Sequence, residues 1–228
     1  MKKIGFIGIY DKIDLILSLA KLFVETKKKV LIIDSTTNQK AKYVVPVINP
    51  TKSYITEFNG IDVAVGFNSF GEIKKYLGIE EEEKNEYDII MIDVDNYQGM
   101  LDFEVQTSDK IYYVTSFDAY SLKKGIELLK KIETPIHMTK VFFSKEMLKE
   151  EVEYFEYLAL GVKVLWNEEK IYFLLENGDQ AVLIENQRIE KIKFKRLSTE
   201  YKDNIIYMVN DMDSTIDDKT LKSIMKNL

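Results

Sequence analysis

Short apolar runs alternate with segments of helical periodicity along most of the chain. Buried strands read as apolar runs of about four to eight residues, whereas helices place apolar residues three and four positions apart. The runs predict strands at Ile4–Ile9, Val30–Asp34, Tyr43–Ile48, Ile61–Val65, Tyr87–Asp93, Ile111–Thr115 and Val141–Phe143. Helical spacing predicts helices after the first strand (Leu15, Leu19, Leu22, Phe23), near Phe70–Leu77 and across Leu122–Ile132. These βαβ units predict an α/β fold, a doubly wound, mainly parallel sheet with helices on both faces.

The pattern is less regular from about residue 162. Apolar runs predict two strands, Val162–Trp166 and Ile171–Leu175, and a polar stretch then precedes helices near Ser198–Met212 and Ser214–Leu228. There is no internal repeat, linker or low-complexity segment. A chain of 228 residues can bury about 70% of its unfolded surface in one core, so we expect a single domain over residues 1–228.

The amino-acid composition limits the kinds of side chain that a functional site of this protein can use. The chain has no cysteine, which excludes disulfides, thiolate metal sites and cysteine nucleophiles, and its single histidine excludes a histidine cluster. Only Arg188 and Arg196 among the 32 basic residues are arginine. Carboxylates and lysines are therefore the groups on which a functional site can be built.

Charge and hydropathy constrain location and partners. A net charge of −6 argues against specific nucleic-acid binding, because phosphate neutralisation supplies most of that affinity, and the basic runs near residues 27–29 and 191–196 are interpreted as solvated faces. No apolar stretch is long enough to span a bilayer. The apolar run after Met1-Lys2-Lys3 is too short for a signal peptide. We expect a cytoplasmic protein.

The loop after the first strand is the leading candidate site. In doubly wound folds ligands bind beyond the carboxyl ends of the strands, and a helix N-terminus there can hold phosphate. Lys12 lies at that point, and Asp34 and Asp93 end two further strands. The alternatives are a surface lysine, carboxylates that cap neighbouring helices, and an Asp11 that caps the helix in place of an anion. A metal site formed by Asp11, Asp14, Asp93 and Asp95 is a further alternative.

At these residues the chain resembles the MinD/ParA branch of the P-loop ATPases. That family has an N-terminal strand, a deviant Walker A loop (K-G-G-x-G-K-[ST]), a long helix, and two later strands that end in aspartate. The segments Lys3–Val24, Lys29–Asp34 and Tyr87–Asp93 match in order and approximate spacing, and the likeness in topology covers about the first 160 residues. It implies cofactor-binding positions at Gly8, Asp11, Lys12, Ile13, Asp34 and Asp93, and it implies a homodimer.

The loop departs from the family motif. Asp11 stands where the family has glycine, Ile13 replaces the hydroxyl that binds Mg²⁺, and Ile7 replaces the signature lysine. A carboxylate about 4 Å from a phosphate charge repels it by about 4 kcal/mol at an effective dielectric near 20. Without a metal-binding hydroxyl, the charge of phosphoryl transfer is not neutralised. We therefore expect no catalytic residues, no metal, and either no cofactor or weakly bound ATP or ADP.

These observations predict a degenerate member of the family that acts through protein partners. It would position or scaffold a bacterial assembly of the partition, pilus or secretion type, similar to the TadZ/CpaE localisation factors. The alternative is a nucleotide-binding switch with an atypical loop. At the C-terminus, Leu221, Ile224, Met225 and Leu228 share one helical face. That face predicts either a docked terminal helix or a peripheral membrane contact.

Overall fold

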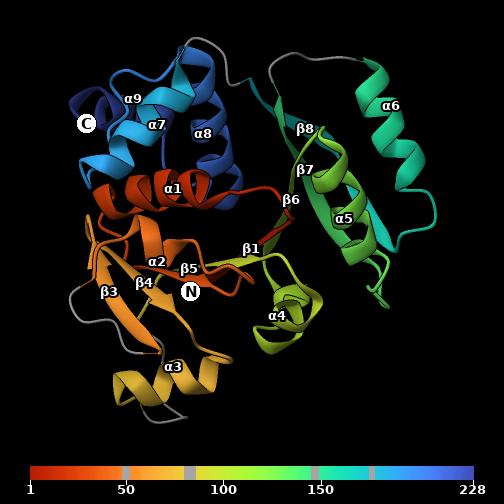
Figure 1. Cartoon of the computed structure of the whole chain (residues 1–228). Helices are drawn as coiled ribbons and strands as arrows, with labels where there is room; N and C mark the ends of the chain where they lie inside the picture. Colours follow the sequence, from red (N-terminus) through yellow and green to blue (C-terminus); the bar gives the residue numbers. More distant parts are fainter. Residues whose placement is uncertain (48–51, 80–85, 145–148, 175–177) are drawn as a thin grey trace.

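The computed structural model describes residues 1–47, 52–79, 86–144, 149–174 and 178–228. Within them the chain forms an eight-stranded sheet of order β3-β4-β2-β5-β1-β6-β7-β8 (Figure 1). The strands are β1 Lys2–Ile7, β2 Val30–Asp34, β3 Tyr54–Phe58, β4 Ile61–Val65, β5 Ile89–Val94, β6 Lys110–Ser116, β7 Ile136–Ser144 and β8 Val164–Leu174. The pairing of β3 with β4 is antiparallel, and the other pairings are parallel. The predicted α/β fold is confirmed.

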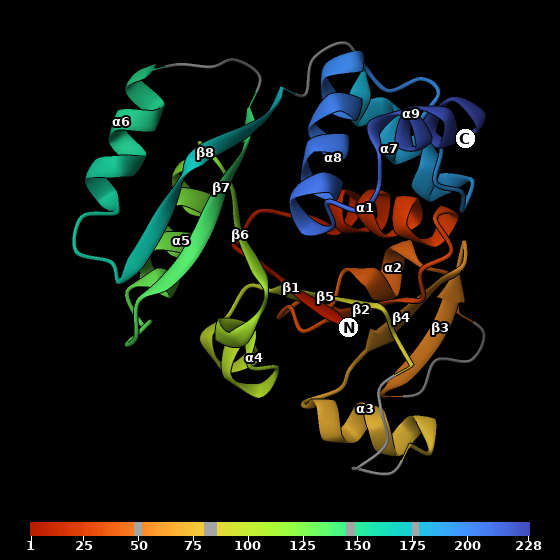
Figure 2. The same cartoon turned by 180° about the vertical axis from the view of Figure 1, so that it is seen from behind.

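Helices cover both faces of the sheet (Figures 1 and 2). One face carries α1 Ile13–Glu25, α2 Ala41–Val44, α7 Asp179–Arg188, α8 Thr199–Met212 and α9 Asp218–Asn227. The other carries α3 Phe70–Leu77, α4 Tyr97–Asp102, α5 Ala119–Leu129 and α6 Lys149–Leu158. No described helix is long and apolar enough to cross a membrane.

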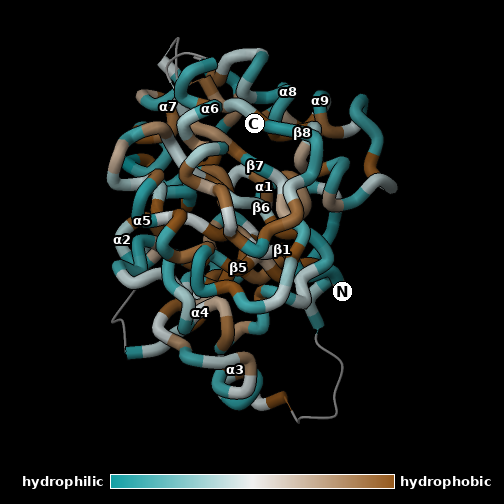
Figure 3. The backbone as a smooth tube through the Cα atoms, turned by 90° about the vertical axis from the view of Figure 1, so that its right-hand side faces the viewer, coloured by the Kyte–Doolittle hydropathy of each residue, from teal (hydrophilic) through white to brown (hydrophobic). Residues whose placement is uncertain are grey.

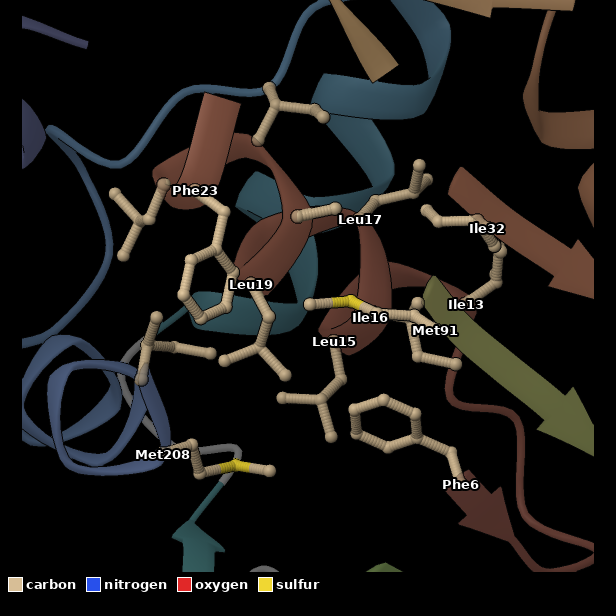
Figure 4. Packing of buried hydrophobic residues seen from close by; sticks show 14 of the residues in the cluster. Phe6, Ile13, Leu15, Ile16, Leu17, Leu19, Phe23, Ile32, Met91 and Met208 are labelled. Atoms are coloured by element: carbon tan, nitrogen blue, oxygen red, sulfur yellow. The ribbon is translucent and has the colours of Figure 1, made fainter. Parts of the chain in front are cut away.

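Two hydrophobic clusters lie on the two sides of the sheet. All six residues of β5 are buried, which explains the near-continuous apolar run of this central strand. Strand β1 alternates, so that Phe6 packs beneath α1 and Ile7 packs on the opposite face. Figure 4 shows Leu15 of α1 beside the ring of Phe6, and both belong to the same hydrophobic cluster as Ile13. Figure 3 colours each residue by its hydropathy and shows hydrophobic residues along β1 and β5.

The strand predicted at Tyr43–Ile48 is wrong over its described residues. Residues 41–44 form α2, where the Asp34 carboxylate accepts a hydrogen bond of 2.8 Å from the backbone N–H of Ala41. Tyr43 is 79% exposed, so its aromatic ring is not evidence of a buried strand. Pro46 cannot continue a helix, and the short helix ends before it. Ile48 lies outside the described residues.

The predicted strand Ile4–Ile9 ends two residues early, at Ile7. Gly8 has a φ of +148°, a conformation that only glycine adopts readily, and it turns the chain out of the sheet. Ile9 therefore belongs to the loop that follows β1, where it lines the cleft described below.

The C-terminal part is more regular than predicted. The two strands predicted at Val162–Trp166 and Ile171–Leu175 are one edge strand, β8, whose polar middle reaches solvent; Leu175 lies outside the described residues. The polar stretch after it contains α7, which the sequence did not predict, and α6, α4 and β3 were also not predicted. The acidic run Glu80–Glu83 lies outside the described residues.

The terminal helix α9 is docked on the protein. Leu221 and Met225 are 0% and 3% exposed, and Ile224 and Leu228 pack against the same cluster. The helix contacts α8 and α1. Of the two predicted arrangements, the described structure has the docked one.

Candidate functional site

The carboxyl ends of β1, β2 and β5 meet at one edge of the sheet. The parallel register places Asp34 beside Asp93 on adjacent strands, and Phe6 of β1 beside Asp93 on the other side. A cleft of about 400 Å³ opens there. Its lining residues are Ile9, Tyr10, Asp11, Lys12, Thr36, Thr37, Asn38, Lys40, Asp93, Asp95, Tyr120 and Lys124. The topology thus brings Asp11, Lys12 and Asp93 together as predicted.

Gly8 sets the path of the loop that enters the cleft. Its N–H donates to the carbonyl of Val94 at 3.1 Å. A Cβ atom at this position would lie 1.9 Å from the Val114 carbonyl oxygen, so the loop crosses β6 at a distance that only glycine allows. The predicted importance of Gly8 therefore has a structural cause that is independent of any ligand.

Lys12 is buried, so the alternative of a surface lysine is wrong. Its Nζ atom lies 2.6 Å from Asp93 Oδ1 and donates to the Gly8 carbonyl oxygen at 2.8 Å. The residue is 3% exposed. The pKa of Asp93 is raised to about 7 in total: burial is the largest cause, the attraction of Lys12 lowers the pKa, and the nearby Asp34 raises it. The ammonium group is therefore held inside the protein by two oxygen atoms.

Asp11 lies at the N-terminus of α1, where the resemblance implies a phosphate. Its Oδ1 atom accepts a hydrogen bond of 3.3 Å from the backbone N–H of Ile13. Its other oxygen lies 2.8 Å from Lys40 Nζ. Lys12, not Asp11, is the N-cap residue of α1, but Asp11 still bonds the first amide of the helix. The carboxylate thus accepts a helix N–H that an anion at this helix N-terminus would use.

The other predicted carboxylates are engaged in hydrogen bonds. Asp34 accepts from the backbone N–H and hydroxyl of Thr36, at 3.0 and 2.6 Å, as well as from Ala41. Asp95 accepts from the N–H and hydroxyl of Thr37, at 2.8 and 2.9 Å. Both carboxylates therefore hold the segment that follows β2 against the edge of the sheet.

Asp14 does not line the cleft. It faces α7, where Gln187 Nε2 donates to both of its carboxylate oxygens at 2.9 Å. Burial raises its pKa to about 6, with the Gln187 hydrogen bond opposing. Among the described residues no group of three or more metal-ligating side chains is present, so the predicted metal alternative at Asp11, Asp14, Asp93 and Asp95 is not formed.

Ile13 is 1% exposed and belongs to the hydrophobic cluster under α1 (Figure 4). It offers the cleft no hydroxyl. Thr36, Thr37 and Lys40 line the cleft but were not predicted, although a polar run directly after a strand-end carboxylate was a usable signal. Tyr120 and Lys124, one turn apart on α5, were not predicted either, because only the topology brings them to the cleft.

Comparison with known proteins gives no match to a family model and no match among curated proteins. Solved structures do match. A ParA family ATPase from Chlorobium tepidum TLS shares 15% identity and a TM-score of 0.60, covering 90% of this chain and 96% of that one. The cell division ATPase MinD of Pyrococcus furiosus shares 14% identity and a TM-score of 0.58, covering 94% and 99%. The septum site-determining protein MinD of Pyrococcus horikoshii OT3, complexed with Mg-ADP, shares 14% identity and a TM-score of 0.57, covering 94% and 96%. The chain therefore has the P-loop NTPase fold of the ParA and MinD ATPases.

Proposed function

We propose that this chain is a degenerate ParA/MinD-like protein that does not hydrolyse ATP efficiently and acts through protein–protein contacts. It would position or scaffold a bacterial assembly of the partition, pilus or secretion type, as the TadZ/CpaE localisation factors do. The observation that carries the proposal is the Asp11 carboxylate, which bonds the first amide of α1. A phosphate in this fold needs that same helix N-terminus.

The electrostatic cost follows from the geometry. Two unit charges about 4 Å apart repel by about 4 kcal/mol at an effective dielectric of 20, and by about 1 kcal/mol in water. The Asp11 side chain is 43% exposed and pairs with Lys40, so the penalty lies between these limits. Because about 1.4 kcal/mol is a factor of ten, the expected loss of phosphate affinity is roughly fivefold to a thousandfold.

Hydrolysis has a second obstacle at Ile13. Phosphoryl transfer relies on Mg²⁺ held partly by a hydroxyl at the start of the helix. Ile13 places a hydrocarbon side chain in the core at that position. Ile7 is likewise fully buried, on the face opposite α1, so no ammonium group replaces the family lysine that reaches across a dimer. Any homodimer is therefore expected to form without nucleotide.

Calorimetric titration with ATP, with and without Mg²⁺, tests the loss of the ATPase. We expect no binding at micromolar ATP by the native chain. A variant that combines Asp11→Gly with Ile13→Thr should bind ATP at least about tenfold more tightly, because it removes the repulsion and restores the hydroxyl. Micromolar binding by the native chain that Lys12→Ala abolishes would refute the proposal. The control is Lys42→Ala, an exposed lysine outside the cleft.

Size-exclusion chromatography with light scattering measures the mass of the protein and tests whether it forms a dimer without nucleotide. The expected mass is that of a dimer both with and without ATP. A dimer that forms only on addition of ATP would contradict a nucleotide-independent scaffold.

The cleft itself favours a second candidate, the nucleotide-binding switch. It adjoins Lys12, Lys40 and Lys124, so cationic groups surround a space of about 400 Å³ at the expected ligand position. A nucleotide would have to displace Lys12 from Asp93 and Asp11 from the helix amide. The same titration separates the two candidates, since only the switch predicts micromolar binding that depends on Lys12.

A further inference from the structure

A groove between α8 and α9 has an apolar floor and a basic rim. It encloses about 440 Å³, and it shares no lining residue with the cleft at the carboxyl edge of the sheet. Ile206 and Met225 contribute its apolar side chains. The remaining lining residues are Lys195, Thr199, Lys202, Asp203, Lys222 and Lys226. Figures 1 and 2 show both helices beside α1, and α8 also contacts β8.

The four lysines of the rim form no ion pair with any residue that the structure describes. Among the described residues none of them has a carboxylate within 4.0 Å, and the Lys202 ammonium donates instead to the Lys195 carbonyl at 3.2 Å. Asp203 is the one acidic residue in the described lining. The chain as a whole carries a net charge of −6, so this local excess of positive charge runs against its overall balance.

We propose that this groove docks an acidic segment of a partner protein that inserts an apolar side chain between α8 and α9. The floor at Ile206 and Met225 suits an apolar anchor, and the four ammonium groups suit carboxylates on either side of it. The inference supplies a partner class for the protein-contact role proposed above, on which it rests. It does not depend on whether the chain hydrolyses ATP.

The shape of the surface favours a protein segment over other anionic partners. A membrane surface would need apolar side chains that protrude, but Leu221 of α9 is fully buried, and Ile206 and Met225 lie at the bottom of the groove, only 4% and 3% exposed. A nucleic acid would gain nothing from an apolar floor, and the lining has no arginine for bidentate contacts with phosphate. An acidic peptide with an apolar side chain can contact both the apolar floor and the basic rim of the groove.

Fluorescence anisotropy with the full chain tests the docking. The probe is a fluorescein-labelled peptide that carries a central pair of leucines with glutamates on both sides. Lys202→Glu combined with Lys222→Glu reverses the charge on both walls of the groove, and binding should weaken by about tenfold or more. The matched control combines Lys75→Glu with Lys131→Glu, two exposed lysines outside the groove with the same change in net charge, and should change binding less than about twofold.

Two further measurements separate the parts of the proposal. A peptide with serines in place of the leucines should bind more weakly, because it lacks the anchor, and salt should weaken both peptides. Circular dichroism shows whether the double variant is folded. If it is not, Lys222→Gln replaces it, because this side chain is exposed on α9 and its substitution should leave the fold intact.

Three results would overturn the proposal: no binding of the leucine peptide by the native chain, an equal loss in the control variant, or groove-dependent binding of phosphatidylglycerol vesicles or duplex DNA in place of the peptide. Because nucleotide enters none of these measurements, failure here is distinguishable from failure of the ATPase titration.

Discussion

The buried pair between Lys12 and Asp93 makes the stability of this protein depend on pH in a way that Lys12→Met should change. Burial raises the pKa of Asp93 from its ordinary value of about 3.8 to about 7. The stability that comes from protonating this group in the folded state is fully present below pH 3.8 and is lost as pH rises to 7. Above pH 7 the native chain holds both charges as an ion pair, and the loss stops.

Methionine fills a similar volume but removes the ammonium group. Without its attraction the pKa of Asp93 rises further, so the variant keeps losing stability above pH 7 at about 1.4 kcal/mol per pH unit. By pH 9 these two pH units add about 3 kcal/mol to the deficit present at pH 6, so the total deficit reaches about 4 kcal/mol, in line with the cost of about 3–5 kcal/mol for breaking a buried pair. At pH 6 both proteins hold a largely neutral Asp93, and the deficit should be only about 1 kcal/mol, the cost of the lost hydrogen bond to Gly8.

Urea unfolding followed by circular dichroism at pH 6, 7, 8 and 9 measures these differences. The control is Lys40→Met, whose partner Asp11 is half exposed, and it should cost less than about 1 kcal/mol at every pH. A Lys12→Met deficit that is the same at pH 6 and pH 9 would refute the reasoning. So would the absence of a deficit at pH 9.

Two further predictions concern the surroundings of the cleft. Gly8→Ala should lower the free energy of unfolding by several kcal/mol, because its Cβ would lie 1.9 Å from the Val114 carbonyl oxygen. The control is Gly78→Ala, at a positive φ with open space around it, which should lower the free energy of unfolding by only about 1 kcal/mol in the same urea titration. Asp14→Asn should stabilise the chain by roughly 1–3 kcal/mol at pH 8 and have little effect at pH 4, because burial raises the pKa of Asp14 to about 6 and ionisation costs stability between these values. An Asp14→Asn variant that is less stable at pH 8 would show that the charge strengthens the Gln187 contact by more than burial penalises it.

The architecture was predictable because its signals are local. Val30–Asp34 and Ile89–Val94 are apolar except for Asp34 and Asp93, because neighbouring strands and helices bury both of their faces. The helix α5 shows clear apolar spacing because one of its faces, with Leu122, Ile126 and Leu129, is buried. The prediction failed where burial is partial. The short helix with Tyr43 has an exposed aromatic ring, and α7 is polar on most of its surface, so neither gives the pattern of a packed element.

The sequence by itself determined the fold class and placed Lys12, Asp34 and Asp93 at one edge of the sheet, because the carboxyl ends of parallel strands meet there. Through the resemblance, it also predicts that Asp11 and Ile13 replace groups on which phosphate chemistry relies. Only the tertiary structure decided that Lys12 is buried against Asp93, that Asp34 and Asp95 hold the segment after β2, and that Asp14 faces α7. The physical reason is range: secondary structure follows from neighbours along the chain, whereas the partner of a charged side chain depends on elements that only packing brings together.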